Sequence, residues 1–231
     1  MIGTIRNAKG RKHRKENNVS RVVAVLVPLV LVWAAPVCAQ DPPPRIPIFV
    51  VDVQGNVPRF PQDPLLADSR GLTVTDLPGS GLGGQLGAHV HLFKFKAITV
   101  GVGGQATLTR AKRTPPAEAR NLKAVTEKFR SLGAQLSLNF GAGTGWSYLS
   151  GGIGRSNWSI VPEGREPLEG DGESLKTINY GGGARWFAKS HLAFSFDVRL
   201  YAINPGVSSL PGKDGSPRTT FMVIGAGVSL K

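Results

Sequence analysis

The chain has 231 residues, of which 41% are hydrophobic and 19% are charged, and its formal net charge is +13. A chain this apolar does not have the composition of a disordered protein, and its length fits one domain or two small ones. Its one cysteine, Cys38, lies in a segment that we expect to be removed, so the mature chain is expected to have neither disulfides nor cysteine-bound metals.

Residues 1–39 have the pattern of a cleaved export signal. Lys and Arg crowd the start, Val22 to Ala35 is an apolar run, and Val37-Cys38-Ala39 offers small residues for cleavage. The run is shorter than the roughly 20 residues that a membrane-spanning helix needs. Acylation of Cys38, as in a lipoprotein, is an alternative that the preceding Pro36-Val37 fits poorly. We predict a signal peptide over 1–39, a proline-rich lead over 40–47 and a single domain over 48–231.

Removal of the signal leaves a mature chain that is still basic. A nucleic-acid binder would concentrate this charge in a stripe with interleaved aromatic residues. Much of it falls instead in expected loops, which favours a solvated basic surface near acidic lipid head groups over nucleic acid. These loop cations are Arg110, Lys112, Arg113, Arg120, Lys123, Lys128 and Arg130.

Strict alternation of apolar and polar residues dominates the rest of the chain and is clearest in 190–201. One set runs from Leu192 through Phe196 to Leu200, and the other includes Asp197 and Arg199. Because a strand sends alternate side chains to opposite faces, this segment is predicted to be a strand with one apolar and one polar face. The same pattern recurs in 82–92, 98–108, 132–140, 178–186 and 222–230.

The polar face of these strands is small, glycine-rich and nearly uncharged, whereas a soluble sandwich would place charged residues toward water. A narrow polar interior and a continuous apolar exterior are typical of a transmembrane β-barrel. Short and long connections also alternate strictly, as periplasmic turns and extracellular loops do. We therefore predict an all-β, eight-stranded, antiparallel up-and-down transmembrane barrel. The short connections are 94–96, 141–145 and 188–190, and the long ones are 54–81, 110–130, 158–175 and 202–218.

Two of the eight segments fit the pattern less well. The first, Ile48 to Val53, is short and apolar on both faces. The other, Trp146 to Ser156, is expected to change phase around Gly151-Gly152, which indicates a bulge.

With this strand pattern and loop rhythm, residues 46–231 resemble the small eight-stranded outer-membrane barrels typified by the OmpA transmembrane domain and OmpX. The resemblance implies a Gram-negative outer-membrane location with both termini periplasmic, among outer-membrane lipids and lipopolysaccharide. It also implies a last strand recognised by the barrel-assembly machinery, and Gly225, Val228 and Leu230 match the spacing of that recognition signal. The family usually ends in an aromatic residue, whereas this chain ends in Leu230-Lys231, and Val223 replaces an expected polar residue.

An eight-stranded barrel has an interior just wide enough to be filled by side chains, which argues against a general diffusion pore. An unpaired charge there is costly, so Asp197 is expected to meet Arg185 or Arg199. We predict a polar lumen network of Asp52, His89, His91, Gln105, Gln135, Arg155, Arg185, Asp197 and Arg199. Aromatic residues near the strand ends, Trp146, Tyr148, Trp158 and Trp186, predict girdles at the membrane interfaces.

No motif indicates catalysis, a metal or a cofactor. The glycine clusters lack a following Gly-Lys-Ser/Thr, which argues against a nucleotide site. His89 and His91 share a face but have no identifiable third metal ligand. His191 and Ser195 are separated by roughly 13 Å of strand, far beyond the ~2.6–3.2 Å that a base and a nucleophile require.

We therefore expect a non-enzymatic outer-membrane barrel that acts structurally or through extracellular loops, which contact lipopolysaccharide or an unknown outside partner. One alternative is a lipid A-modifying barrel enzyme of the deacylase or acyltransferase kind, which would need a histidine beside a serine at the membrane edge. A second is a soluble secreted β-protein.

Overall fold

The computed structural model describes residues 45–115, 123–164, 172–207, 212 and 214–231. The predicted signal peptide and most of the proline-rich lead lie outside these ranges. Within them, no helix has the length and hydrophobicity needed to cross a membrane.

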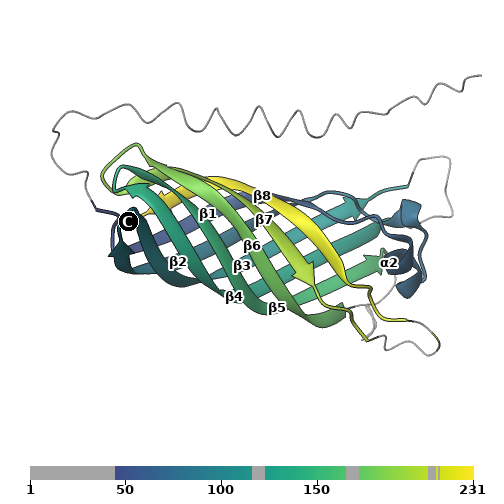
Figure 1. Cartoon of the computed structure of the whole chain (residues 1–231). Coiled ribbons are helices and arrows are strands. Elements are labelled where there is room, and N and C mark those ends of the chain that lie inside the picture. Colours follow the sequence, from purple (N-terminus) through teal and green to yellow (C-terminus); the bar gives the residue numbers. More distant parts are fainter. Residues whose placement is uncertain (1–44, 116–122, 165–171, 208–211, 213) are drawn as a thin grey trace, which may run out of the picture. The chain divides into compact units, whose positions relative to one another are not determined.

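Eight antiparallel strands form a closed barrel in which each strand pairs with its neighbours in sequence and the last pairs with the first (Figure 1). The predicted fold class is thus confirmed. The strands are β1 (Phe49–Arg59), β2 (Leu82–Phe95), β3 (Ile98–Arg113), β4 (Val125–Ala142), β5 (Gly145–Pro162), β6 (Gly172–Phe187), β7 (Leu192–Ile203) and β8 (Thr219–Leu230).

The connections define the two ends of the barrel. At the turn end, short connections join β2 to β3, β4 to β5 and β6 to β7, and the C-terminus lies there too (Figure 1). At the loop end, the longer connections follow β1, β3, β5 and β7. This alternation agrees with the sequence, but the strands reach further toward the loop end than predicted. β4 and β5 each have 18 residues, so much of the predicted loops 110–130 and 158–175 is strand.

Two strand predictions need correction. β1 continues to Arg59 because Gln54 and Asn56 extend its inward polar set beyond the apolar start. β5 keeps one phase throughout and pairs with β4 without a register shift at Gly151-Gly152. The one register shift lies instead in β2, between His91 and Phe93.

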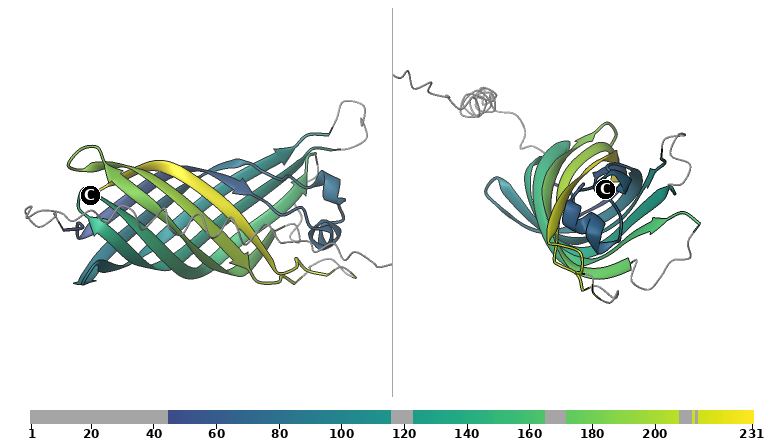
Figure 2. Two further views of the ribbon diagram at one scale, coloured as in Figure 1. Left: turned by 45° about the horizontal axis from the view of Figure 1, so that its top comes forward. Right: turned by 90° about the vertical axis from the view of Figure 1, so that its right-hand side faces the viewer.

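The connection after β1 contains the only helices in the described part of the chain, α2 (Pro64–Ser69) and the 3₁₀ turn η1 (Val74–Asp76). The Asp63 side chain accepts hydrogen bonds from the backbone N–H groups of Leu65 and Leu66, and Pro64 occupies the first turn. Both features favour the start of a helix. Viewed from the loop end, the dark blue segment that holds α2 lies across the mouth of the barrel (Figure 2, right).

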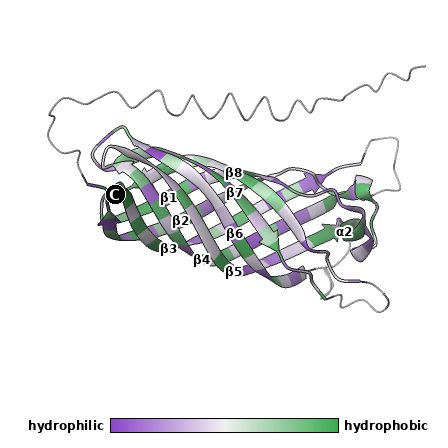
Figure 3. Cartoon of the chain, in the orientation of Figure 1, coloured by the Kyte–Doolittle hydropathy of each residue, from purple (hydrophilic) through white to green (hydrophobic). Residues whose placement is uncertain are grey.

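Hydrophobic and hydrophilic residues alternate along the strands (Figure 3), and the hydrophobic ones point outward as an apolar band. On β4 and β6 the band runs from Leu132 to Phe140 and from Ile178 to Trp186. These spans of about nine residues match the roughly 9–11 that a tilted strand needs to cross a bilayer. A surface this apolar and continuous is unsuited to water. Exposed aromatic side chains gather near its turn end, at Phe49, Phe93, Phe95, Phe140, Trp186 and Phe194.

Candidate functional site: a filled lumen and a cationic outer rim

A buried ion pair crosses the lumen between β1 and β6. Arg185 donates from Nε to Oδ1 of Asp52 at 2.8 Å and from Nη2 to Oδ2 at 2.6 Å. Both side chains are at least nine-tenths buried, and Ser229 on β8 donates a further hydrogen bond to the same carboxylate. The guanidinium carbon also lies 4.0 Å from the ring centre of Tyr148. The paired charges and the ring together fill the middle of the barrel.

A second buried ion pair lies on β7. Asp197 and Arg199 project to the same inner face, and the guanidinium donates to both carboxylate oxygens at 3.1 and 3.0 Å. The Tyr148 hydroxyl donates to Asp197 at 2.8 Å, while Arg199 also donates to Ser150 and Asn179. Asp197 was expected to pair with Arg185 or Arg199. In the structure it pairs with Arg199, while Arg185 pairs with Asp52.

Further inward polar side chains extend the network. Gln135 donates to both Gln105 and Asn179, and His89 lies within hydrogen-bond distance of Gln135 at 3.0 Å. His91, nearer the turn end, contacts the backbone carbonyl of Pro47 instead. Its ring also makes an edge contact with the indole of Trp146 at 5.9 Å between centres. The two histidines thus serve separate contacts, and the described residues contain no group of three or more metal-ligating side chains.

Almost no space is left between these side chains. The cavity bounded by the two ion pairs, Tyr148, His89 and their neighbours measures about 10 Å³, which is at most about enough for one water molecule. The polar network therefore closes the middle of the lumen.

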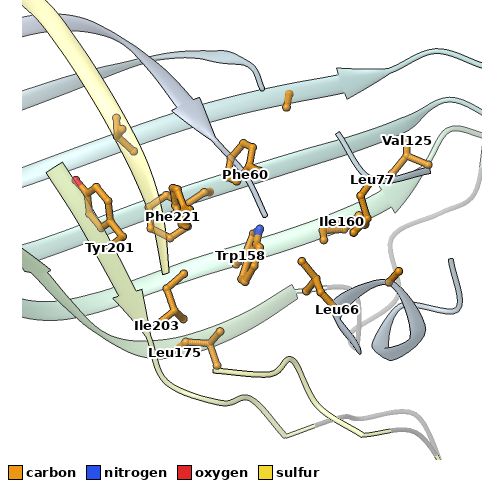
Figure 4. Packing of buried hydrophobic residues seen from close by; sticks show 14 residues of the cluster. Phe60, Leu66, Leu77, Val125, Trp158, Ile160, Leu175, Tyr201, Ile203 and Phe221 are labelled. Carbon is orange, nitrogen blue, oxygen red and sulfur yellow. The ribbon is translucent and has the colours of Figure 1, made fainter. Parts of the chain in front are cut away.

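Above the network, toward the loop end, the lumen becomes apolar. Phe221 packs edge-on to Phe129 at 4.8 Å and stacks on Tyr201 at 5.7 Å between ring centres, and Leu66 of α2 is fully buried against the same group (Figure 4). We call this cluster the apolar plug. It consists of Phe60, Leu66, Ala67, Leu77, Ala111, Val125, Phe129, Trp158, Ile160, Leu175, Tyr201, Ile203, Phe221 and Val223.

A buried acid lies beside the apolar plug. Glu127 is fully buried, and its Oε1 accepts a hydrogen bond from Nε1 of Trp158 at 2.8 Å. Its other oxygen has no hydrogen-bond partner among the described residues. Glu127 lies beyond the apolar band, next to the outward Lys128. Burial raises the pKa of its carboxyl group to about 8, although the Trp158 hydrogen bond opposes this shift.

A third buried ion pair ties the helix to the barrel wall. Arg70, which ends α2, donates to Oε2 of Glu173 at 2.6 Å and to Oγ of Ser216 at 2.9 Å. The Ser216 hydroxyl donates in turn to Glu173. This contact joins the loop after β1, the start of β6 and the loop before β8, so it holds the apolar plug in the mouth of the barrel.

Several predicted site residues have a different position. Arg155 lies on the outer face of β5 and is exposed, not in the lumen network. Trp146, Tyr148 and Trp158 are 3%, 5% and 0% exposed and point inward, so they form no girdle, whereas Trp186 points outward at 59%. The cause is the alternation of side chains along β5. The three aromatic residues belong to its inward set, with Ser150 and Ser156. Arg155 belongs to its outward set, with Leu149 and Ile153. Position near a strand end does not decide which face a side chain occupies.

Sequence reasoning also missed the apolar plug, Glu127 and the Arg70 tether. The inward set of β4 includes Phe129 and Glu127. If the predicted strand had begun before Leu132, it would have placed both side chains in the lumen. In the connection that contains α2, the only sequence signal was the helix start at Asp63-Pro64, because apolar and polar residues do not alternate there as they do in a strand.

A cationic rim lies on the outer wall just above the apolar band. Arg155 on β5 is the register partner of Lys176 on β6, and Arg110 on β3 is the register partner of Lys128 on β4. All four side chains are exposed. Among the described residues, none of the four has an ion-pair partner, whereas the exposed Lys112 pairs with Glu163. Like charges placed opposite each other repel, so this rim is suited to anions supplied from outside the chain.

The residues required by an acyl-transfer enzyme do not come together. Ser195 is buried in the lumen, where it accepts a hydrogen bond from Gln54. His191 is exposed in the turn before β7 and contacts the backbone carbonyl of Lys231.

Comparison with models of known protein families finds no match, and comparison with curated protein sequences finds none either. The fold is similar to the crystal structure of Neisserial surface protein A, at 14% identity, over 79% of this chain and 96% of that one, with a TM-score of 0.50. Ail, the attachment invasion locus protein of Yersinia pestis, matches at 16% identity, over 79% of this chain and 97% of that one, with a TM-score of 0.45. At these identities the likeness concerns the fold alone. It agrees with a small barrel of the outer-membrane kind, while the closer resemblance to OmpA and OmpX remains a prediction.

Proposed function

We propose that the protein is a non-enzymatic, non-conducting integral barrel of the Gram-negative outer membrane. Its turn end faces the periplasm and its loop end faces outward, and it acts through its outer wall and loops in contact with lipopolysaccharide. The observation that carries this proposal is the closed interior, where two ion pairs leave a cavity of about 10 Å³ beneath the apolar plug. In a barrel filled in this way, only the outer wall and the loops are available for contacts with other molecules.

The orientation is supported by the loops and by the charges. Long connections and the cationic rim lie at the same end, and the outer leaflet of this membrane carries the phosphate-rich lipid. Insertion would follow recognition of β8 by the barrel-assembly machinery. β8 closes the barrel by pairing with both β1 and β7, and its outward set ends in Val228 and Leu230.

The enzyme alternative has little support, because the exposed His191 and the buried Ser195 make separate contacts. A soluble secreted protein is disfavoured by the exposed apolar band, in which Leu132, Ile153 and Phe194 are 69%, 71% and 66% exposed.

The proposal is tested by expressing the full chain in a Gram-negative host and separating its membranes. We expect the protein in the outer-membrane fraction, released only by detergent, with a gel mobility that changes on boiling because a folded barrel resists the detergent until it is heated. Protease added to intact cells should cleave within the loop-end connections and spare the turns. Recovery in the soluble periplasmic fraction would contradict the proposal.

A further inference from the structure

The outer wall carries a groove that the sealed lumen does not explain. It extends over β3, β4, β5 and β6 and has a volume of about 890 Å³. Its outward residues are mostly small or aliphatic, and include Gly104, Ala134, Ile153 and Ile178. It therefore crosses the upper part of the apolar band, where lipid chains would lie.

The hollow arises because small residues adjoin across the strands. Gly104 pairs in register with Ala134, which in turn pairs with Ile153. A Cβ built on Gly104 would meet only one atom within 4 Å, the backbone oxygen of Gly133 at 3.4 Å. A larger side chain at position 104 would thus fit on the wall and fill the groove.

The upper edge of the groove is cationic. Arg155 and Lys176 both line it and are register partners on adjacent strands. They have no ion-pair partner among the described residues. Two exposed cations held side by side above an apolar groove complement a phosphate group joined to acyl chains.

A second groove of the same design lies beside the first. It has a volume of about 320 Å³, runs over β2, β3 and β4, and includes Leu82, Gly84 and Leu108 together with three cations, Arg110, Lys128 and Arg130. The two grooves share β3 and β4, and each has its own group of cations. Two chain grooves with two separate groups of cations fit a lipid that has several acyl chains and two phosphates better than a phospholipid with one phosphate.

We propose that this wall is a binding site for the lipid A portion of lipopolysaccharide, with acyl chains in the two grooves and phosphates at the two groups of cations that line them. The inference rests on the proposed outward orientation of the loop end. It makes the wall of β2–β6, rather than the loops alone, the surface that holds the lipid.

The test uses the full-length mature protein, folded in a zwitterionic detergent and first checked for heat-modifiable mobility. Purified hexa-acylated, bisphosphorylated lipid A is titrated, and bound lipid is counted by native mass spectrometry. We expect one tightly retained lipid A, weaker binding after removal of its phosphates, and weaker binding again of phosphatidylglycerol.

Two variants address the two halves of the site. Arg155→Gln with Lys176→Gln should weaken lipid A binding roughly 30-fold, since each cation contributes a factor of about five near an anionic lipid. Gly104→Leu should reduce binding by filling the groove while both cations remain. The matched controls are Lys94→Gln with Lys189→Gln at the turn end, and Gly55→Leu on the outer face of β1, where a new Cβ also has space. Both controls should bind lipid A like the unchanged protein.

In lipid-free detergent the Arg155→Gln, Lys176→Gln protein should be as stable as the unchanged protein or slightly more so, because a repulsion is relieved. Equal retention of lipid A by the site variants and the controls would overturn the inference, as would equal binding of phosphatidylglycerol. Either result in a protein that is heat-modifiable and lies in the outer membrane leaves the proposed function intact. Recovery in the periplasm would instead overturn the proposed function itself.

Discussion

At the scale of single residues, the barrel depends on charges that are buried in pairs. Asp52 and Arg185 approach from strands on different sides of the lumen, and neither charge has access to bulk water. Burying a charge is costly unless it is paired, so removal of one partner should cost more than the pair itself contributes.

Asp52→Asn should therefore destabilise the folded barrel by about 3–5 kcal/mol, because the Arg185 charge is left uncompensated. The measurement is urea unfolding in lipid vesicles followed by tryptophan fluorescence. Glu163→Gln provides the control, since its pair with Lys112 is solvent-exposed and its loss should cost about 1 kcal/mol or less. A similar small loss for both variants would show that Arg185 finds another partner.

Glu127 makes the stability of the loop end dependent on pH. Its pKa is raised from 4.5 to about 8 by burial, so the folded state holds a proton that the unfolded chain releases. Stability should then be greatest below about pH 4.5 and fall as pH rises toward 8, with a slope on the order of 1.4 kcal/mol per pH unit.

Glu127→Gln keeps an oxygen for the Trp158 N–H and removes the titration. Its melting temperature should exceed that of the unchanged protein at pH 8 and approach it at pH 4.5. Parallel pH profiles for the two proteins would show that Glu127 does not titrate in this range.

At the scale of residues, the sequence predicted that charged side chains in the lumen must be paired better than it predicted which residues form each pair. It indicated that Asp197 must meet an arginine, but Asp52 and Arg185 are brought together across the barrel, and spacing along a strand cannot show that contact. Arg155 was misplaced because Gly151-Gly152 carries no side chain that reveals the phase of β5.

At the scale of elements, α2 and the rest of the connection after β1 help to close the loop end of the barrel. Leu66 is fully buried in the apolar plug, while its neighbour Leu65 is 68% exposed. The two leucines therefore form a matched pair for testing whether the helix packs into the barrel.

Leu66→Ala should cost about 2–5 kcal/mol through lost burial and the cavity left behind, whereas Leu65→Ala should change stability by about 0.5 kcal/mol or less. Hydrogen exchange should show faster exchange of the backbone N–H groups of Ala67 and Leu72, which donate to Asp63 and Ala67, in the first variant only. Equal protection in both variants would mean that α2 lies on the surface and is not anchored by Leu66.

The strands were predictable because their alternation is imposed by lipid on one side and a narrow interior on the other. The α2 segment obeys neither constraint, since it contacts the lumen only through a few side chains such as Leu66 and Leu77. The extent of β4 and β5 was underestimated for a related reason: the outward residues beyond Leu132 on β4 and beyond Ile153 on β5 become charged or polar. An alternation of charged or polar residues with apolar ones was interpreted as a loop.

At the scale of the whole molecule, a filled interior and an apolar, cation-rimmed exterior support the proposal that the protein acts through its outer surface. Closure of β8 on β1 leaves no free sheet edge among the described strands, which is the condition for strands to lie stably in lipid. The lumen side chains stabilise this closed barrel, and the two ion pairs and their neighbours leave a cavity of only about 10 Å³ between them.

The most direct test of this account is the conductance of the folded protein in planar lipid bilayers, after heat-modifiable mobility has confirmed its insertion. The account predicts no stepwise current with the unchanged protein at moderate voltage. Stable, reproducible single-channel steps would contradict it, because they require an open path through the lumen that Asp52, Arg185, Asp197 and Arg199 close.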